Sequence, residues 1–160
     1  MAGIYFMSGI MPVTTQLGAF DYIGLTKRDQ IERLEEHLDR LDANKHSNQL
    51  IQGFYNQFGR GRLVTGAIIE CDEYYLNTLE KVYINNLNTY KGSNPEGWNK
   101  SRGGEGAKNY QIPYALESGG IYHYGDNLQL FLQQQKNVNP TGIISLLDGK
   151  SQRFDGWTKL

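Results

Sequence analysis

Apolar residues in the first half of the chain fall into short runs and helical repeats, which predict its elements. Residues 2–7 and 20–25 are β-prone runs separated by a loop that contains Gly, Pro and Thr, so we expect a hairpin with a long connection. Residues 62–70 predict a third strand. Helices are expected between the second and third strands and again after the third.

Three helices are expected in this half, each from an apolar stripe at intervals of three and four residues. The first has Thr26 as its expected cap and Asp29 as the far member of a capping box, and its outer face is acidic. The second is expected to start at Ser47 and stop at Gly59, and the third to cover residues 73–88. The three stripes are Ile31, Leu34, Leu38 and Leu41; Leu50, Ile51, Phe54 and Phe58; and Leu76, Leu79, Tyr83, Ile84 and Leu87.

The rest of the chain has weaker and shorter patterns. Residues 91–106 contain five glycines and a proline and predict no regular element, and residues 107–122 are expected to be a linker. Residues 127–136 then predict a helix, and Pro140 begins another that ends before Gly149. The apolar residues of the first of these helices are Leu128, Leu130, Phe131 and Leu132. Two short helices joined by a tight turn have the outline of a helix-turn-helix.

Composition limits the classes of protein that fit. The chain has 160 residues, 39% of them hydrophobic, which is enough for one domain with a buried core plus a small appendage and is not typical of a disordered chain. The single cysteine, Cys71, excludes an internal disulfide, and no His and Cys spacing matches a zinc finger. The apolar start lacks a basic segment and is too short to span a bilayer, so we expect a soluble, cytoplasmic protein.

The net charge of −1 is not typical of a nucleic-acid-binding protein, but the charge is unevenly distributed. Residues 29–42 and residues 70–80 carry −4 each, so the remainder of the chain carries +7. That excess predicts a modest non-specific affinity for nucleic acid, with a shallow dependence on salt concentration.

Glu80 gives the sharpest chemical signal in the sequence. At about 100° per residue it falls about 40° from Leu76, inside the apolar stripe of the third expected helix. A carboxylate that faces inward costs several kcal/mol unless it is paired, protonated or bound to a metal. Spacing alone leaves two interpretations of Glu80 open. In the first, Glu80 forms a buried salt bridge or lies at the rim of the apolar stripe; in the second, it is a metal ligand.

Arg33 and His37 lie four residues apart and share one helix face, where they could act as a phosphate-binding cation and a proton carrier. Alternatively, the two residues lie at this spacing only because they belong to the solvent-exposed side of an acidic helix. His46 alone predicts a surface histidine, and Tyr5 and Tyr22 predict cross-strand aromatic residues. None of these residues is specific by itself.

In combination these residues resemble the GIY-YIG nuclease family. Gly3-Ile4-Tyr5 and Tyr22-Ile23-Gly24 match the two halves of the family's name, and the later segments follow in the family's order. Those segments are Thr26-Lys27-Arg28 with Arg33 and His37, Lys45-His46-Ser47-Asn48, Leu79-Glu80-Lys81, Gly97-Trp98-Asn99 and Gly103-Gly104-Glu105-Gly106. The resemblance covers residues 2–106, and the sixteen-residue gap between the two tyrosines is longer than is usual for the family.

The resemblance implies an α+β fold, with a small antiparallel three-stranded sheet flanked by helices. It implies a nuclease domain at residues 1–106, followed by the linker at 107–122 and a small, mostly helical DNA-binding module at 123–160. The implied catalytic residues are Tyr5, Tyr22, Arg33, His37, His46, Glu80 and Asn99.

Phosphodiester hydrolysis needs positive charge on the phosphate oxygens and a path for protons. The resemblance implies that Glu80 holds one Mg²⁺, for which Mn²⁺ substitutes, and that Arg33 clamps the phosphate. Tyr5 and Tyr22 are implied to act on the attacking water with help from His37, because a phenol with a pKa of about 10 is a poor base at neutral pH. Which tyrosine is the base stays open. His46 and Asn99 are implied to support the site.

The C-terminal residues resemble the small DNA-binding modules of homing and phage nucleases. Gly149-Lys150 followed by Gly156-Trp157 is the ending that such modules share, and the expected helix at residues 141–147 would enter the major groove of double-stranded DNA. The alternative is an extension that only packs on the nuclease domain. Over the whole chain, the expected DNA contacts are Lys27, Arg28, Lys100, Arg102, Ser145, Lys150 and Arg153.

Together the two resemblances predict a metal-dependent DNA endonuclease of the homing or phage-encoded type, in a bacterial or phage-infected cell. They imply no membrane and no protein partner, and they leave the oligomeric state open. One alternative is a restriction or repair nuclease of the same fold, in which other domains would replace the tail. The other is an inactive DNA-binding regulator, which would be expected to lack Arg33 or Glu80.

Overall fold

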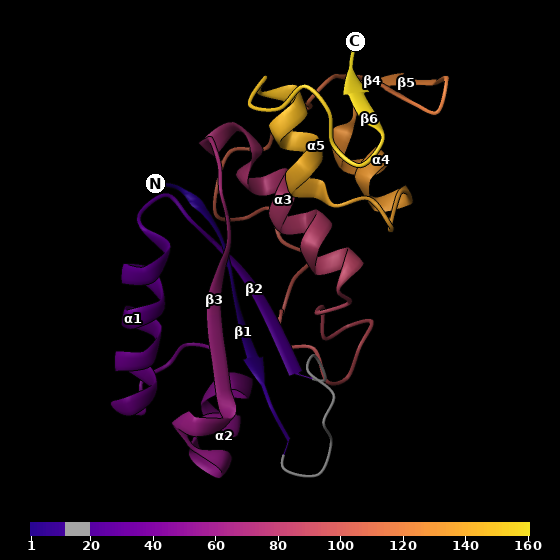
Figure 1. Cartoon of the computed structure of the whole chain (residues 1–160). Helices are drawn as coiled ribbons and strands as arrows, with labels where there is room; N and C mark the ends of the chain where they lie inside the picture. The colour runs from indigo at the N-terminus through magenta and orange to yellow at the C-terminus, as the bar shows by residue number, and fades with distance from the viewer. Residues whose placement is uncertain (12–19) are drawn as a thin grey trace.

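The computed structural model describes residues 1–11 and 20–160 (Figure 1). Three strands, β1 (Gly3–Gly9), β2 (Phe20–Thr26) and β3 (Leu63–Glu70), form an antiparallel sheet in the order β2-β1-β3. β1 pairs with β2 along its whole length, which confirms the expected hairpin, and residues 12–19 of the connection lie outside the described residues. Because β1 is central, β2 forms one edge of the sheet.

Both helices between β2 and β3 begin one or more residues later than the sequence predicts. α1 (Gln30–Asp42) is capped by Asp29, whose carboxylate accepts two backbone hydrogen bonds. The expected cap, Thr26, is wrong because Thr26 is the last residue of β2. α2 (Gln49–Phe58) is capped by the side chain of Asn48 rather than by Ser47, and a short 3₁₀ turn, η1 (Arg60–Arg62), leads from it into β3.

The alternation of side chains along β1 creates a core on each face of the sheet. Ile4 packs with Leu76 and Leu79 of α3 (Glu73–Asn86), whereas Tyr5 and Met7 pack with residues of α1 and α2. α1 and α3 accordingly lie on either side of the sheet, and α2 lies at one end of it (Figure 1). The α+β fold of this half, expected from the sequence, is therefore confirmed.

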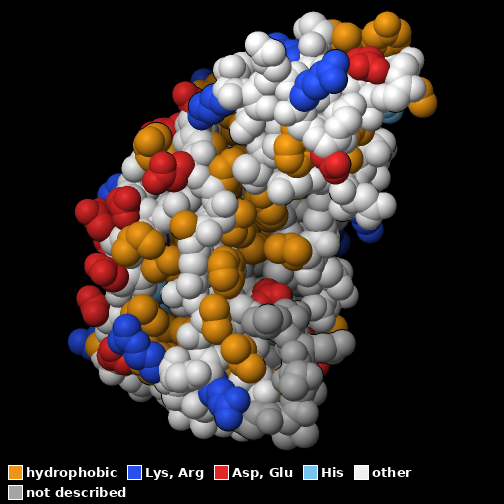
Figure 2. Space-filling model, viewed as in Figure 1, with side chains coloured by type: hydrophobic (Ala, Val, Ile, Leu, Met, Phe, Trp, Pro, Cys, Tyr) orange, Lys and Arg blue, Asp and Glu red, His pale blue; other side chains and the backbone are white. Residues whose placement is uncertain are grey.

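Two residues of the apolar stripes predicted for the first half are exposed. Ile31 is 56% exposed because α1 turns Leu34, His37 and Leu41 inward. Leu87 is 53% exposed because α3 ends at Asn86. The acidic outer face expected for α1 is present, and Figure 2 shows Asp and Glu side chains along that side of the molecule.

The C-terminal part contains strands that the sequence did not predict. β4 (Tyr114–Ser118) pairs with β5 (Ile121–Gly125) and β6 (Trp157–Lys159) in a second antiparallel sheet of order β5-β4-β6. α4 (Leu128–Gln134) and α5 (Pro140–Leu147) follow the expected helices, although Leu130 of the predicted stripe is exposed. The segment expected to be a linker, residues 107–122, therefore includes β4 and the start of β5.

This C-terminal module packs directly on α3. One apolar cluster joins Leu76 and Leu79 to Leu116, Leu128 and Ile143. The Tyr83 hydroxyl lies 2.7 Å from the Thr141 hydroxyl of α5. Figure 1 shows the module grouped around one end of α3, with the chain's C-terminus at its outer side. The division into two domains stays a prediction.

The burial of α5 contradicts its expected role. Five of its eight residues are buried and the other three are half-buried, so the helix is the core of the module. A helix that enters the major groove of DNA needs an exposed polar face, and α5 has none. Within residues 1–11 and 20–160, no helix is long and apolar enough to cross a membrane.

Candidate active site

A cavity of about 520 Å³ lies beside the edge strand β2 and brings together most of the predicted catalytic side chains. Five of the seven line it: Tyr5, Tyr22, Arg33, Glu80 and Asn99. They come from β1, β2, α1, α3 and the segment after α3, so the cavity collects residues from both faces of the sheet. The other two, His37 and His46, lie buried behind Tyr5.

The buried residues form a chain of hydrogen bonds that leads to the cavity. The Tyr5 hydroxyl lies 2.8 Å from His37 Nε2, and His37 Nδ1 lies 2.7 Å from His46 Nε2. His46 Nδ1 lies 3.0 Å from the backbone nitrogen of Asn48. Every ring nitrogen in this chain therefore has a partner, and His46 is an interior residue rather than the surface residue that its sequence context suggested.

The direction of these bonds follows from Asn48. Its backbone N–H can only donate and lies 3.0 Å from His46 Nδ1, closer than its carbonyl oxygen at 3.3 Å. His46 Nδ1 is therefore the acceptor, and the proton of the neutral ring sits on Nε2, which donates to His37 Nδ1. By the same argument His37 carries its proton on Nε2 and donates to the Tyr5 oxygen.

Both histidines are neutral at pH 7. Burial, reinforced by the positive charge of Arg33, lowers the pKa of His37 to about 3. Burial also lowers the pKa of His46. A histidine that is neutral and whose tautomer is fixed acts as a hydrogen-bond donor of defined direction.

The two tyrosines differ in their surroundings. Burial raises the pKa of the Tyr5 hydroxyl overall, although the positive charge of Arg33 and the neighbouring Tyr22 hydroxyl oppose that rise. Burial raises the pKa of Tyr22 well above its usual value, and the negative charges of an ionised Tyr5 and of Glu80 add to that rise. The pKa of both hydroxyls is therefore raised, but the groups around Tyr5 mostly oppose the rise, whereas those around Tyr22 mostly add to it.

Arg33 is held by a carboxylate on its own helix. Its Nη1 lies 2.7 Å from Glu36, and Arg28 contacts the other oxygen of Glu36 at 2.8 Å. The Arg33 side chain lines the cavity and remains 27% exposed. A guanidinium has five N–H donors, so the bond to Glu36 leaves donors for an anion in the cavity.

Glu80 reaches the cavity from α3, and a glycine-rich loop holds it. Its Oε2 accepts a hydrogen bond of 2.8 Å from the Gly104 N–H. Gly103 and Gly104 have φ of +83° and +95°, and a Cβ on Gly103 would approach Oε2 to 2.9 Å, so this loop needs glycine. Asn77, one turn earlier on α3, donates to the carbonyls of Gly104 and Ala107 and ties the loop to the helix.

The charge of Glu80 has no cationic partner in the part of the chain that the structure describes. Burial is the main cause that raises its pKa, and Glu105, which lines the same cavity, adds to that rise. Within the same residues no three His, Cys, Asp or Glu side chains gather as metal ligands. These residues fit a cation such as Mg²⁺ that is held by one carboxylate and completed by water and phosphate oxygens.

Asn99 closes the edge of the first sheet. Its Oδ1 accepts from the Ile23 N–H at 2.9 Å and its Nδ2 donates to the Ile23 carbonyl at 2.8 Å, so the side chain acts like a neighbouring strand for β2. The Thr89 hydroxyl also donates to Oδ1 at 2.7 Å. Asn99 therefore fixes the strand that carries Tyr22, which agrees with the supporting position implied for it.

Two glycines of the sequence motifs make room for other side chains. Gly24 pairs with Tyr5 across β1 and β2, and a Cβ at Gly24 would overlap the Tyr5 ring and hydroxyl. Gly3 leaves room for the amide of Gln30, which donates to carbonyls of both β1 and β3 beside a bulge in their pairing. The glycines thus permit the positions of Tyr5 and of the start of α1.

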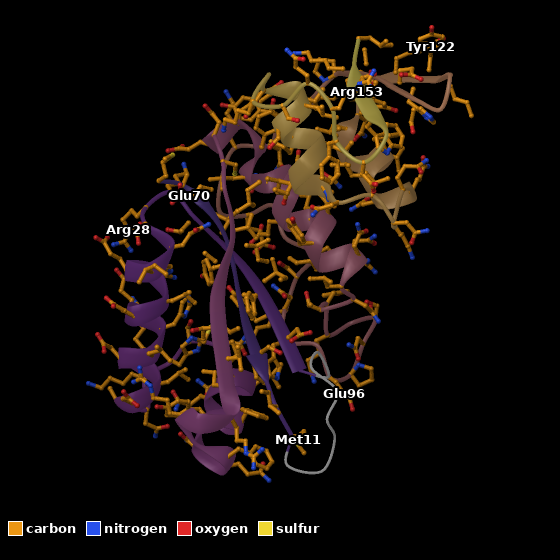
Figure 3. All side chains as sticks on the ribbon, viewed as in Figure 1. Met11, Arg28, Glu70, Glu96, Tyr122 and Arg153 are labelled. Atoms are coloured by element: carbon orange, nitrogen blue, oxygen red, sulfur yellow. The ribbon has the colours of Figure 1, made fainter. Side chains whose placement is uncertain are left out.

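The predicted DNA contacts do not form one surface. Lys100 lines the catalytic cavity, whereas Arg102 lies 4.7 Å over the Tyr90 ring in a neighbouring cavity. Figure 3 shows Arg28 and Arg153 far apart, near α1 and on the C-terminal module. Three of the predicted residues form exposed ion pairs: Lys27 with Glu73, Arg28 with Glu36, and Lys150 with Asp148. Ser145 is half-buried on α5.

The sequence reasoning assigned no role to three residues that shape the site. Asn48 could have been recognised as a cap, because it directly precedes the second apolar stripe. Glu105 lies in the glycine-rich segment at residues 103–106, and its charge among glycines is the signal that could have identified it. Asn77 carries no sequence signal, because its partners are backbone carbonyls more than 25 residues away.

Comparison with solved structures identifies related folds. The structure is similar to a glutamate-to-alanine mutant of the catalytic domain of the intron endonuclease I-TevI, with a TM-score of 0.52 and 21% identity over 66% of this chain and 98% of that chain. It is also similar to the catalytic domain of the homing endonuclease I-TevI, with a TM-score of 0.50 and 20% identity over 63% of this chain and 99% of that one. No protein-family model matches the chain, and no curated protein matches it significantly. These likenesses confirm the fold that the GIY-YIG resemblance predicts.

Proposed function

We propose that this protein is a metal-dependent endonuclease that hydrolyses phosphodiester bonds in double-stranded DNA. The observation that carries the proposal is the cavity beside β2, where Arg33, Glu80 and Tyr5 meet. Tyr5 ends the buried chain of hydrogen bonds through His37 and His46, which we call the relay. A permanent cation, a carboxylate suited to a hard metal ion and a hydroxyl surrounded by donors are groups that displacement at phosphorus requires. A fold shared with catalytic domains described as intron and homing endonucleases supports the same assignment.

We assign Tyr5 rather than Tyr22 as the base. His37 donates to the Tyr5 oxygen and does not accept its proton, because Asn48 fixes the tautomers of the relay. Burial keeps the pKa of Tyr5 above its ordinary value, and the charge of Arg33 opposes that rise, so the phenolate forms more readily as pH increases. When Tyr5 has released its own proton to solvent through the cavity, the phenolate takes a proton from the attacking water, and the leaving oxygen takes a proton from solvent. Tyr22 stays protonated, because burial raises its pKa well above the usual value.

The remaining residues bind and orient the phosphate. Arg33 contacts the non-bridging oxygens through the donors that Glu36 does not use. Glu80 would hold Mg²⁺, or Mn²⁺ in its place, and Gly104 keeps the carboxylate oriented. Bound there, the ion supplies positive charge to the phosphate and to the leaving oxygen. Lys100 adds a second cation to the cavity wall.

The proposal extends to the homing or phage-encoded type. Both similar structures are described as intron or homing endonucleases, and they match 66% and 63% of this chain, which also contains a second sheet with α4 and α5. A restriction or repair nuclease is the alternative within the same class. An inactive regulator fits less well, because Tyr5, Arg33 and Glu80 all line one cavity.

A plasmid-nicking assay on the full chain tests the proposal. Supercoiled plasmid should be nicked or linearised with Mg²⁺ or Mn²⁺ and left intact with EDTA. Arg33→Ala should lose activity by a factor of about 10² to 10³, as when one donor to a developing oxyanion is removed. Arg62→Ala is the matched control, because Arg62 is exposed and lies outside the cavity. Cleavage in EDTA, or equal cleavage by the two variants, contradicts the proposal.

A further inference from the structure

A second cavity, of about 660 Å³, adjoins the catalytic cavity on the other side of the glycine-rich loop. Gly103 lines both cavities. The second cavity is bounded by α3, by the segment that follows α3, by α4 and by Lys136 just after α4. We call it the amide groove, because Asn and Gln side chains are its commonest lining residues, among them Gln129 and Gln133 of α4.

The amide groove carries positive charge without a compensating acid. Lys81, Arg102 and Lys136 line it, and no Asp or Glu does so among the residues that the structure describes. Within those same residues none of the three cations forms an ion pair. Lys81 donates to the side-chain oxygen of Asn109 at 2.7 Å, and Arg102 stacks on Tyr90, so two of the three cations are held in place by neutral partners.

We propose that the amide groove binds the DNA strand on one side of the scissile phosphate, with α4 as the helix that faces DNA. The proposal rests on the proposed nuclease function and names a second part of its substrate site. Lys81 and Lys136 supply charge for phosphates, and the stacked Arg102 and Tyr90 present a flat surface to a base or sugar. The amide side chains offer both donors and acceptors to base edges.

The position of the groove on α3 connects it to the cut. Glu80 and Lys81 are consecutive residues of α3, about 100° apart around the helix, and one lines each cavity. The loop residue Gly103 separates them. DNA that occupies both cavities therefore passes over one short stretch of one helix, and the distance from the cut to the groove contacts is fixed.

Burial favours α4 over α5 as the DNA-facing helix. Gln129 and Gln133 are one turn apart on α4 and both line the groove. α5 has no exposed residue, and its Thr141 hydroxyl is bonded to Tyr83 of α3. The helix that the sequence pattern selected therefore stabilises the module, and the preceding helix presents the polar surface.

Binding measurements in EDTA test this assignment without requiring cleavage. The full chain is titrated against a labelled, mixed-sequence duplex of about 30 base pairs, long enough to extend beyond one such interface. The groove pair, Arg102→Gln with Lys136→Gln, is compared with a matched control pair, Lys45→Gln with Arg62→Gln, which removes the same charge from exposed positions outside both cavities. Thermal unfolding of each variant confirms that it folds.

We expect the groove pair to weaken binding about tenfold or more and to reduce the slope of log K against log salt by about 0.9, since Lys136 is the phosphate contact of this pair and Arg102 contacts a base or sugar. The control pair should stay within about twofold of the wild type. Equal losses in the two pairs, or no binding by the wild type, overturn the proposal. A third pair, Lys150→Gln with Arg153→Gln, tests the α5 side, and a loss there larger than in the groove pair overturns the assignment of α4.

The same experiment separates failure of the groove from failure of the proposed function. Glu80→Gln should bind the duplex like the wild type and fail to cut plasmid. If Glu80→Gln still cuts while the groove pair loses binding, the catalytic assignment is wrong and the groove stands. If Glu80→Gln is inactive and the groove pair binds like the wild type, the groove assignment alone is wrong.

Discussion

The two sides of the catalytic cavity are held in place in different ways. On the α1 side, Tyr5, His37 and His46 form a buried chain of hydrogen bonds that ends at the backbone N–H of Asn48. On the α3 side, Glu80 is oriented by one N–H of a glycine-rich loop, and a second carboxylate, Glu105, lines the same cavity.

This difference separates a preorganised half of the site from a half that needs a ligand. On the α1 side every ring nitrogen of His37 and His46 has a hydrogen-bond partner, so the relay is already fully formed before substrate binds. On the α3 side burial opposes the charge of Glu80, and a bound cation would remove that cost. Substitutions on the two sides should therefore change stability in opposite directions while both reduce activity.

The largest effect is expected from Glu80→Gln. Plasmid cleavage should fall by a factor of about 10³ or more, because the substitution removes the proposed metal ligand. The apoprotein should be at least as stable as the wild type at pH 7, because burial raises the pKa of Glu80 above its ordinary value of 4.5 and the charged form is disfavoured. The stability advantage of Glu80→Gln over the wild type is fully present above the pKa of Glu80 in the folded protein, and it disappears as pH falls below the ordinary glutamate pKa of 4.5. Urea unfolding in EDTA at pH 7 and pH 4 measures it, and a less stable Glu80→Gln protein at pH 7 contradicts the comparison.

Gly24→Ala should reduce cleavage by a factor of about 10², because its methyl group would displace Tyr5 from the cavity. The matched control is Gly53→Ala on α2, where a Cβ meets nothing within 4 Å. That control should cleave normally and gain about 0.5–1 kcal/mol of stability from the helix preference of alanine. A Gly24→Ala protein with normal kcat shows that the position of Tyr5 is not critical.

His37→Phe should reduce cleavage by a factor of about 10², since it removes the donor to Tyr5 and leaves the Nε2–H of His46 without its acceptor. His37→Gln keeps an amide donor and should recover part of the loss. A pH–rate profile separates this positioning role from a general loss of folding, because the rise of activity with pH should move to higher pH in His37→Phe. An unchanged profile contradicts the relay.

Acid should destabilise the α1 side. The unfolded chain binds protons at His37 and His46 as pH falls below about 6.5, whereas the folded protein keeps His37 neutral down to about pH 3. Stability is therefore full above pH 6.5 and decreases as pH falls from there toward pH 3, by about 1.4 kcal/mol per pH unit for His37, and the lowered pKa of His46 adds a contribution of the same sign. Thermal unfolding between pH 7 and pH 4 measures the slope, and His37→Phe should reduce it by one histidine's share. Equal slopes in the two proteins contradict the assignment of His37 as neutral.

The smallest effect is expected from Asn77→Ser, which loosens the loop that orients Glu80. The Mg²⁺ concentration for half-maximal cleavage should rise about fivefold, equivalent to a net hydrogen bond of about 1 kcal/mol, while kcat at saturating Mg²⁺ stays within about twofold. Asn109→Ser is the control, because Asn109 also donates to Gly104 but is exposed. A fall in kcat without a change in the Mg²⁺ requirement shows that Asn77 does not help to orient Glu80.

The first half of the molecule could be predicted closely because its signals are local. The apolar stripes, the order of Tyr5, Tyr22, Arg33 and Glu80, and the inward angle of Glu80 all follow from spacings within one element or from chain order. The errors there are at helix ends and at exposed stripe positions such as Ile31, where the choice of cap decides which face turns inward.

The C-terminal module was predicted less well because its elements are short and its strands pair at long range. β4 pairs with β6 across about forty residues, and no local pattern specifies such a partner. The helical spacing of α5 was correct, but spacing does not tell whether a short apolar helix is covered by a neighbour. The packing of α3 against the module decided that α5 is buried and that α4 faces the amide groove.

The sequence by itself determined the elements of the first half and the unusual position of Glu80, because these depend on helical and strand periodicity. The set of candidate catalytic residues came from the order of its motifs, which resembles that of the GIY-YIG family. Only the tertiary structure decided that His46 continues the relay from His37, that Asn48 fixes its direction and that Lys81 faces a different cavity from Glu80. The reason is physical: a hydrogen bond or an unneutralised charge is a property of neighbours in space, and those neighbours come from distant parts of the chain.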